Sequence, residues 1–75
     1  MTRDEAIQSA LRWYPSDAQL LHSVLSCRGA NSGRPLWLLR FGRCVKREGF
    51  TRVISSSILI DDESGQAVGA PDDWE

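Results

Sequence analysis

Two stretches of alternating apolar residues, separated by Glu48 and Gly49, constrain the fold of this chain most. Residues 36–45 place four large apolar side chains on one face: Trp37, Leu39, Phe41 and Val45. Residues 52–60 return with the same period of two, which is typical of β-strands. If Glu48 and Gly49 form a two-residue hairpin loop, the register places Trp37 opposite Ile60, Leu39 opposite Ile58, Phe41 opposite Ser56 and Arg43 opposite Ile54. A loop longer by several residues is the alternative, because residues 46–51 contain no other strong turn signal.

A helix is predicted over residues 2–14. Apolar residues there recur at helical spacing and form one stripe: Ala6, Ile7, Ala10, Leu11 and Tyr14. Thr2 and Glu5 have the spacing of a capping box, in which each side chain satisfies the other residue's free N–H. Pro15 cannot continue a helix and disfavours helical angles at the residue before it. We therefore expect the helix to end at Tyr14.

Residues 16–28 fit two patterns. A helical face is formed by Leu20, Leu21, Val24 and Leu25. Ser16 and Gln19 repeat the capping-box spacing, and Gly29 is a helix stop. The same residues also alternate as a strand that is apolar on much of both faces. We adopt the strand because the family resemblance described below favours it.

The remaining signals complete a small α+β fold. Residues 29–35 are a turn cluster, residues 61–65 form a second turn, and residues 66–68 form a short final strand. The 75 residues allow one domain, which we place at 1–68, followed by a mobile acidic tail at 69–75. The predicted architecture is an N-terminal helix packed on a small antiparallel sheet of about three to four strands, in two layers.

Residues 2–68 resemble the PepSY family in the order of their elements and in short motifs. The matching positions are Thr2, Glu5, Ala6 and Ala10, then Gly33, Pro35, Leu36 and Trp37, and finally the ending at residues 60–68. PepSY domains occur in propeptides of thermolysin-type metalloproteases and in many secreted or membrane-attached bacterial proteins, where an inhibitory role has been proposed. The resemblance implies a helix on an antiparallel sheet and a role in binding or restraining another protein. The chain departs from that setting because no signal sequence or protease accompanies it.

The sequence offers little for catalysis or metal binding. His22 is the only general base near neutral pH, and no nucleophile motif surrounds it. Cys27 and Cys44 lack the close spacing of a zinc site, and we expect both to be free thiols. The acids at residues 61–63 are explained by an Asp that caps its own turn. We therefore predict no enzyme, no catalytic residue, no cofactor and no metal site; the alternative is a small enzyme or ligand carrier using His22 in a helix–sheet cleft.

Charge is unevenly distributed along the chain. Residues 28–52 hold seven basic residues and one acid, Glu48: Arg28, Arg34, Arg40, Arg43, Lys46, Arg47 and Arg52. Residues 61–75 hold six acids and no base. One interpretation is a solvated hairpin with a solubilising tail. The other is that the basic hairpin docks an acidic partner, with the tail as competitor or second contact.

The predicted partner is another protein. The candidate binding residues are Arg40, Arg43, Lys46, Arg47, Arg52 and Trp74, the last an aromatic anchor between acids. Nucleic acid is not expected because the net charge is −1. A membrane is not expected because there is no apolar run of membrane-spanning length, and the expected location is the cytoplasm. The uncharged run at residues 53–60 is predicted to be interior to the sheet or paired across a homodimer through a sheet edge.

Overall fold

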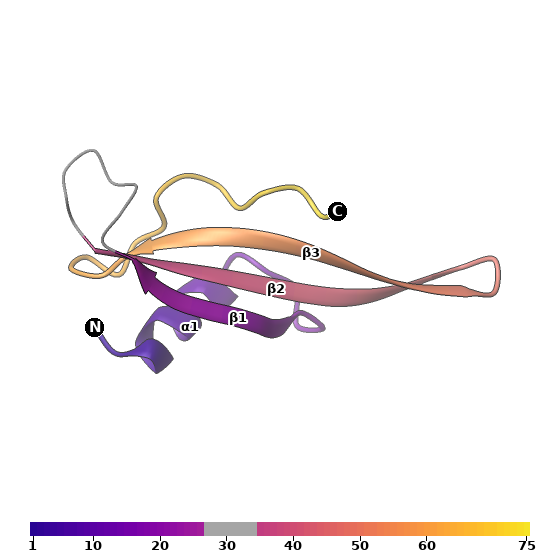
Figure 1. The fold of residues 1–75 in the computed structure, drawn as a ribbon, viewed down its shortest axis with the longest axis horizontal. Helices are drawn as coiled ribbons and strands as arrows, with labels where there is room; N and C mark the ends of the chain where they lie inside the picture. The colour runs from indigo at the N-terminus through magenta and orange to yellow at the C-terminus, as the bar shows by residue number, and fades with distance from the viewer. Residues whose placement is uncertain (27–34) are drawn as a thin grey trace.

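The structure, a computed structural model, describes residues 1–26 and 35–75. It contains one helix and one antiparallel sheet of order β1-β2-β3, which confirms a small α+β fold (Figure 1). The elements are α1 (Arg3–Leu11), β1 (Gln19–Ser26), β2 (Leu36–Arg47) and β3 (Phe50–Asp61). The short final strand expected at residues 66–68 is reduced to one isolated bridge, between Ala67 and Ile60.

The β2–β3 hairpin has the predicted register. Trp37 lies opposite Ile60, Leu39 opposite Ile58, Phe41 opposite Ser56 and Arg43 opposite Ile54. The loop is the two-residue one, because Arg47 pairs directly with Phe50. Glu48 and Gly49 both have positive φ, at 49° and 83°. Two such residues in succession form the type I′ turn, whose twist matches that of the flanking strands.

Helix α1 begins as predicted and ends earlier. The Thr2 hydroxyl accepts the Glu5 N–H at 3.2 Å, and the Glu5 carboxylate accepts the Thr2 N–H at 2.8 Å. These contacts with Thr2 lower the pKa of Glu5. The predicted end at Tyr14 is wrong, since the helix ends at Leu11. The N–H of Tyr14 donates to the carbonyl of Leu11, three residues back, so the chain tightens into turns before it reaches Pro15.

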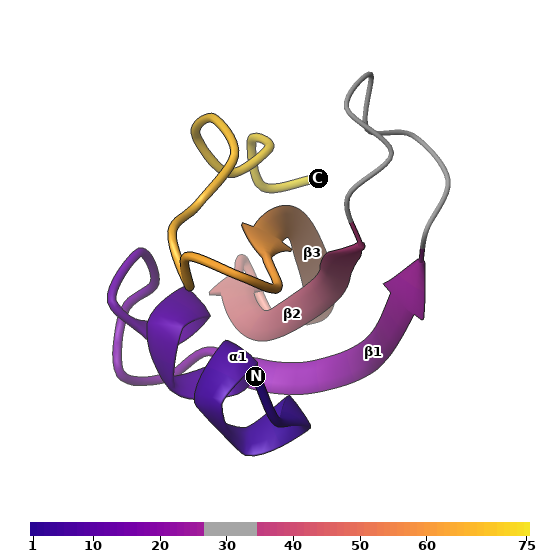
Figure 2. The ribbon, with the colours of Figure 1, turned by 90° about the vertical axis from the view of Figure 1, so that its left-hand side faces the viewer.

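The core is one cluster to which the helix and two strands contribute. Its fully buried members are Ala6, Ala10, Leu39, Phe41, Ile58 and Ile60. The Tyr14 ring packs on Phe41 with 4.6 Å between centroids. Trp37, predicted to be core, is half-buried against the cluster, and its indole N–H donates to Asp62 Oδ1 at 2.8 Å. Figure 2 shows α1 to one side of the curved sheet.

The strand interpretation of residues 16–28 is confirmed for Gln19–Ser26, and the helical alternative there is wrong. Pairing with β2 shifts by one residue between Leu20 and His22. Leu21 lies over Gly42, where a Cβ would come within 2.7 Å of its side chain. A larger residue at position 42 therefore requires the exposed Leu21 side chain to move. Cys27 and the turn cluster at residues 29–34 lie outside the described residues.

The turn after β3 is the one that the sequence predicts. Asp61 Oδ1 accepts the N–H groups of Glu63 at 2.8 Å and Ser64 at 3.2 Å, and Gly65 has a φ of 72°. The carboxylate of Asp61 thus caps its own turn. In the described ranges, no helix is long and apolar enough to cross a membrane.

The acidic tail at residues 69–75 packs along β3, and two expectations from the sequence are therefore wrong. It does not stand free of the domain but follows the outer edge of β3 (Figure 1). Ser55 and Glu75 exchange backbone hydrogen bonds of 2.8 and 3.0 Å, and the Asp72 N–H donates to the Ser57 carbonyl at 3.0 Å. β3 is also not interior to the sheet; it is an outer strand, and the tail satisfies backbone groups that would otherwise be unpaired.

Candidate partner-binding site

The β2–β3 hairpin extends beyond the rest of the domain as a two-stranded arm, residues 43–54. Pairing between β1 and β2 ends at Gly42, and backbone pairing between the tail and β3 ends at Ser55. The arm therefore projects past both neighbours, as Figure 1 shows at the right of the molecule. It makes the molecule long and narrow, with principal extents of 46, 21 and 17 Å.

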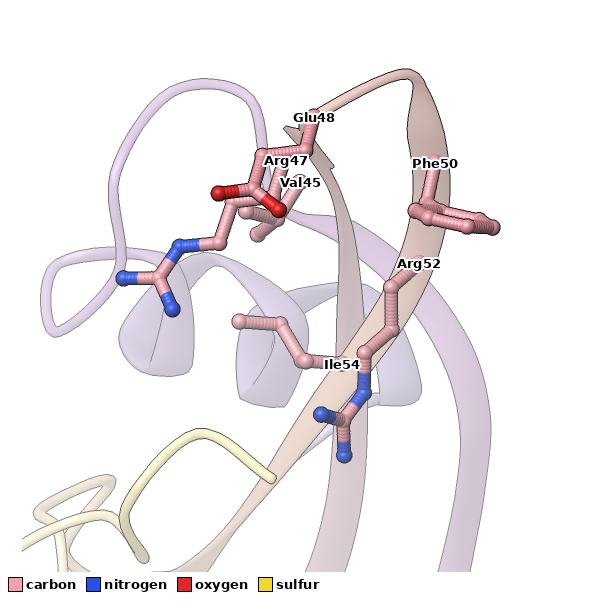
Figure 3. A pocket seen from close by; sticks show the side chains of 6 residues that line it. All are labelled: Val45, Arg47, Glu48, Phe50, Arg52 and Ile54. Carbon is pink, nitrogen blue, oxygen red and sulfur yellow. The ribbon is translucent and has the colours of Figure 1, made fainter.

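One face of the arm combines apolar and basic side chains. By strand alternation this face continues the face of the core, but α1 does not reach it. Six residues line an open hollow of about 450 Å³ there: Val45, Arg47, Glu48, Phe50, Arg52 and Ile54 (Figure 3). Phe50 is 76% exposed at the tip of the arm. A large aromatic ring without cover is the feature of this face that most suggests an interface.

Apart from Arg43 at its base, the arm has three basic side chains, Lys46, Arg47 and Arg52, and all three are exposed. Within the described part of the chain, none of the three has an ion pair or side-chain hydrogen bond. Glu48 is the only acid among residues 43–54. The arm is therefore positively charged and projects into solvent, where its charge can attract an acidic partner.

The other two predicted arginines lie where the arm joins the body of the domain. Arg43 forms an ion pair with Asp17 at 3.1 Å, and its guanidinium lies 5.6 Å from the centre of the Trp74 ring. The Arg40 side chain lies against Ser57, with 3.4 Å between Nε and Oγ. The structure therefore divides the predicted patch. Arg47 and Arg52 share one face of the arm and Lys46 lies on the opposite face, whereas Arg40 and Arg43 contact the chain itself.

Trp74 is engaged within the domain. Its ring packs edge-on against Tyr14 at 5.4 Å between centroids. The Tyr14 hydroxyl lies 3.0 Å from Ser56 Oγ, which donates to the Asp72 carbonyl at 2.6 Å. Burial raises the pKa of Tyr14. The contacts of Trp74, a predicted docking residue, are thus made within the domain, where they hold the tail.

Phe50 is not among the binding residues predicted from the sequence. Its position was visible, since it directly follows the Glu48-Gly49 turn and is therefore at the tip of any hairpin built on that loop. The length of the arm cannot be predicted from the sequence pattern. It depends on where the pairing of β1 and of the tail stops, and the β2–β3 pattern carries no information on this.

The residues considered for other chemistry lie apart from the arm hollow. His22 is exposed on β1, opposite Arg40, rather than enclosed in a helix–sheet cleft. Cys44 is a free, exposed thiol. Among residues 1–26 and 35–75, no group of three or more His, Cys, Asp or Glu side chains is arranged to hold a metal ion. No family model, curated protein or solved structure matches this chain.

Proposed function

We propose that this protein is a non-catalytic binding module whose arm docks onto an acidic surface of a partner protein. One observation carries the proposal: Arg47 and Arg52 project from the domain on the same face of the arm as the uncovered Phe50, Lys46 projects from the opposite face, and nothing in the described chain pairs with these charges. A narrow arm of this kind reaches into a cleft that the bulk of the domain cannot enter. Docking there blocks the cleft, so the module acts as an inhibitor or neutraliser of its partner.

The physical roles of the arm residues differ. Phe50 supplies the apolar anchor, because aromatic residues near the centre of an interface carry much of its binding energy. Arg47 and Arg52 supply charge-assisted hydrogen bonds, and a guanidinium can bind both oxygens of one carboxylate. Charges at a solvent-exposed rim mainly accelerate association, and salt screens them. The binding rate is therefore expected to fall as salt increases.

Two expectations from the sequence belong to this proposal. The first is that α1 and the sheet form two layers as in PepSY-like domains, and the shared core cluster of α1, β2 and β3 supports it. The second is that binding restrains the partner, as the PepSY resemblance implies. An acidic protein is preferred over nucleic acid because the chain as a whole has a net charge of −1.

The test compares two double charge reversals that change the net charge equally. Arg47→Glu/Arg52→Glu alters the arm, whereas Arg3→Glu/Arg12→Glu alters two exposed residues around α1. Proteins cross-linked to the wild-type chain in its native host are identified by mass spectrometry, and the association rate of each is then measured against salt concentration. We expect the arm variant to associate at least tenfold more slowly at low salt, with a flatter salt dependence, and the α1 variant to behave as wild type. Unchanged kinetics for the arm variant would remove the arm from the interface.

A further inference from the structure

The outer edge of β3 continues beyond the part that the tail covers. Ser55 and Ser57 direct backbone groups towards the tail, which they meet at Glu75 and Asp72. Backbone groups point to the same edge at every second residue of a strand in an antiparallel ladder. The groups of residues 51 and 53 therefore face this edge too, and within the described chain no backbone hydrogen bond is made to them there. The tail occupies one half of a longer edge.

The tail itself is held as a short peptide ligand would be held. Trp74 is its one large apolar side chain, and it contacts Tyr14 and Arg43. Most other tail residues are exposed, and the segment has no assigned strand of its own. Asp72, Asp73 and Glu75 line a hollow of about 240 Å³ together with Arg40. Backbone pairing and one aromatic anchor thus account for its attachment, and its acids share a hollow with one arginine.

We propose that the β3 edge over residues 51–57 is a strand-addition site for an extended acidic segment of the partner protein, for which the tail is a built-in competitor. The site takes a strand with an aromatic residue in the place of Trp74 and acids around it. Such a strand continues past the position of Glu75 and pairs with Val53 and Thr51. This inference rests on the proposed function, since it names the mode in which the acidic partner binds.

A partner strand has two advantages over the tail. It gains backbone hydrogen bonds at Val53 and Thr51, and these main-chain bonds are the basis of affinity in strand addition. Its acids also reach Arg52, which lies beyond the tail on the same face of the sheet as Arg43 and Trp74. Against this, the tail has the high effective concentration of a tethered segment, of the order of millimolar for short flexible linkers. A second copy of this chain is disfavoured as occupant, because pairing two arms brings like charges together.

The experiment uses the complete chain and two synthetic peptides. One peptide has the sequence of residues 66–75, and the other extends it by Glu-Val-Glu-Val to reach the arm. The variant Trp74→Ala weakens the tail, Trp13→Ala is a matched control at an exposed tryptophan on another part of the surface, and Trp74→Phe retains a ring. Binding is measured by fluorescence anisotropy, and amide exchange at Val53 and Thr51 by NMR.

We expect Trp74→Ala to bind the extended peptide at least tenfold more tightly than wild type, Trp13→Ala to match wild type, and Trp74→Phe to lie between. The extended peptide should slow amide exchange at Val53 and Thr51, and replacing its tryptophan by alanine should weaken binding at least tenfold. Equal binding by Trp74→Ala and Trp13→Ala would overturn the proposal. Loss of the fold in Trp74→Ala would also overturn it, because the tail would then be an obligatory part of the domain. Dimerisation of that variant without peptide would overturn it as well.

Failure of this inference differs from failure of the proposed function. If Arg47→Glu/Arg52→Glu slows association with the partner while the peptides bind no variant, the arm docks as proposed and strand addition is wrong. If the peptides bind Trp74→Ala as expected while charge reversal leaves partner kinetics unchanged, the edge site stands and docking through the charged arm is wrong.

Discussion

Phe41→Ala tests the position of the core most directly. The Phe41 side chain is 0% exposed, lies at the centre of β2 and packs on the Tyr14 ring at 4.6 Å. Removing a buried phenylalanine side chain costs about 3 to 5 kcal/mol, of which an aromatic pair contributes about 0.5 to 1.5 kcal/mol. Natural domains have about 0.05 to 0.15 kcal/mol of stability per residue, which gives roughly 4 to 11 kcal/mol for a chain of this length. The substitution therefore removes a large part of the stability of the fold.

Phe50→Ala is the matched control, because it makes the same chemical change in the same hairpin at a ring that is 76% exposed. Urea denaturation followed by circular dichroism gives the free energy of unfolding of each variant. We expect Phe50→Ala to lie within about 0.5 kcal/mol of wild type. If Phe41→Ala does not fold, Phe41→Leu should still fold and show a smaller loss. A cost for Phe41→Ala below about 1 kcal/mol, or one equal to that of Phe50→Ala, would refute the assignment of the core to this face.

Three further predictions concern the turns. The hydrogen bond from the Trp37 indole N–H is the main cause that lowers the pKa of Asp62. This contact therefore stabilises the fold above about pH 4, and the stabilisation is lost as the pH falls through the lowered pKa. A carboxyl titration by NMR should show the lowered pKa of Asp62 in the wild type, and an unshifted pKa would contradict the contact. In the hairpin turn, Glu48→Asn should stabilise the fold by about 0.5 to 1 kcal/mol because asparagine tolerates positive φ better. Gly49→Ala should destabilise the fold by about 1 kcal/mol through backbone conformation alone, since nothing lies within 4 Å of the added Cβ. Thermal melts in which Glu48→Asn destabilises and Gly49→Ala stabilises the fold would exclude the type I′ turn.

The sequence predicted the hairpin well because its information is local. Alternation placed Trp37, Leu39 and Phe41 on one face, and the Glu48-Gly49 turn set the pairing partner of each. The capping box at Thr2 and the turn after Asp61 were predicted for the same reason. In each case the residues that determine the geometry lie within a few positions of one another.

The tail and the extent of the arm were not predictable in this way. Glycine, proline and acids at residues 69–75 are typical of an exposed segment, and nothing local shows that Trp74 meets Tyr14, 60 positions earlier. The structure brings only some residues of the predicted basic patch onto the projecting arm. Whether an arginine projects or folds back depends on distant neighbours such as Asp17 beside Arg43, which strand periodicity does not specify.

The open edges of the arm also affect how copies of the protein behave towards each other. A two-stranded ribbon with unpaired backbone on both sides and an exposed ring at its tip is a template for uncontrolled pairing between chains, as in aggregation. Lys46, Arg47 and Arg52 act against this, since like charges on adjacent ribbons repel one another and keep concentrated solutions dispersed. Neutralising rather than reversing these charges is therefore expected to reduce solubility. The three side chains that we propose attract a partner also disfavour pairing between identical copies, so selection on one property constrains the other.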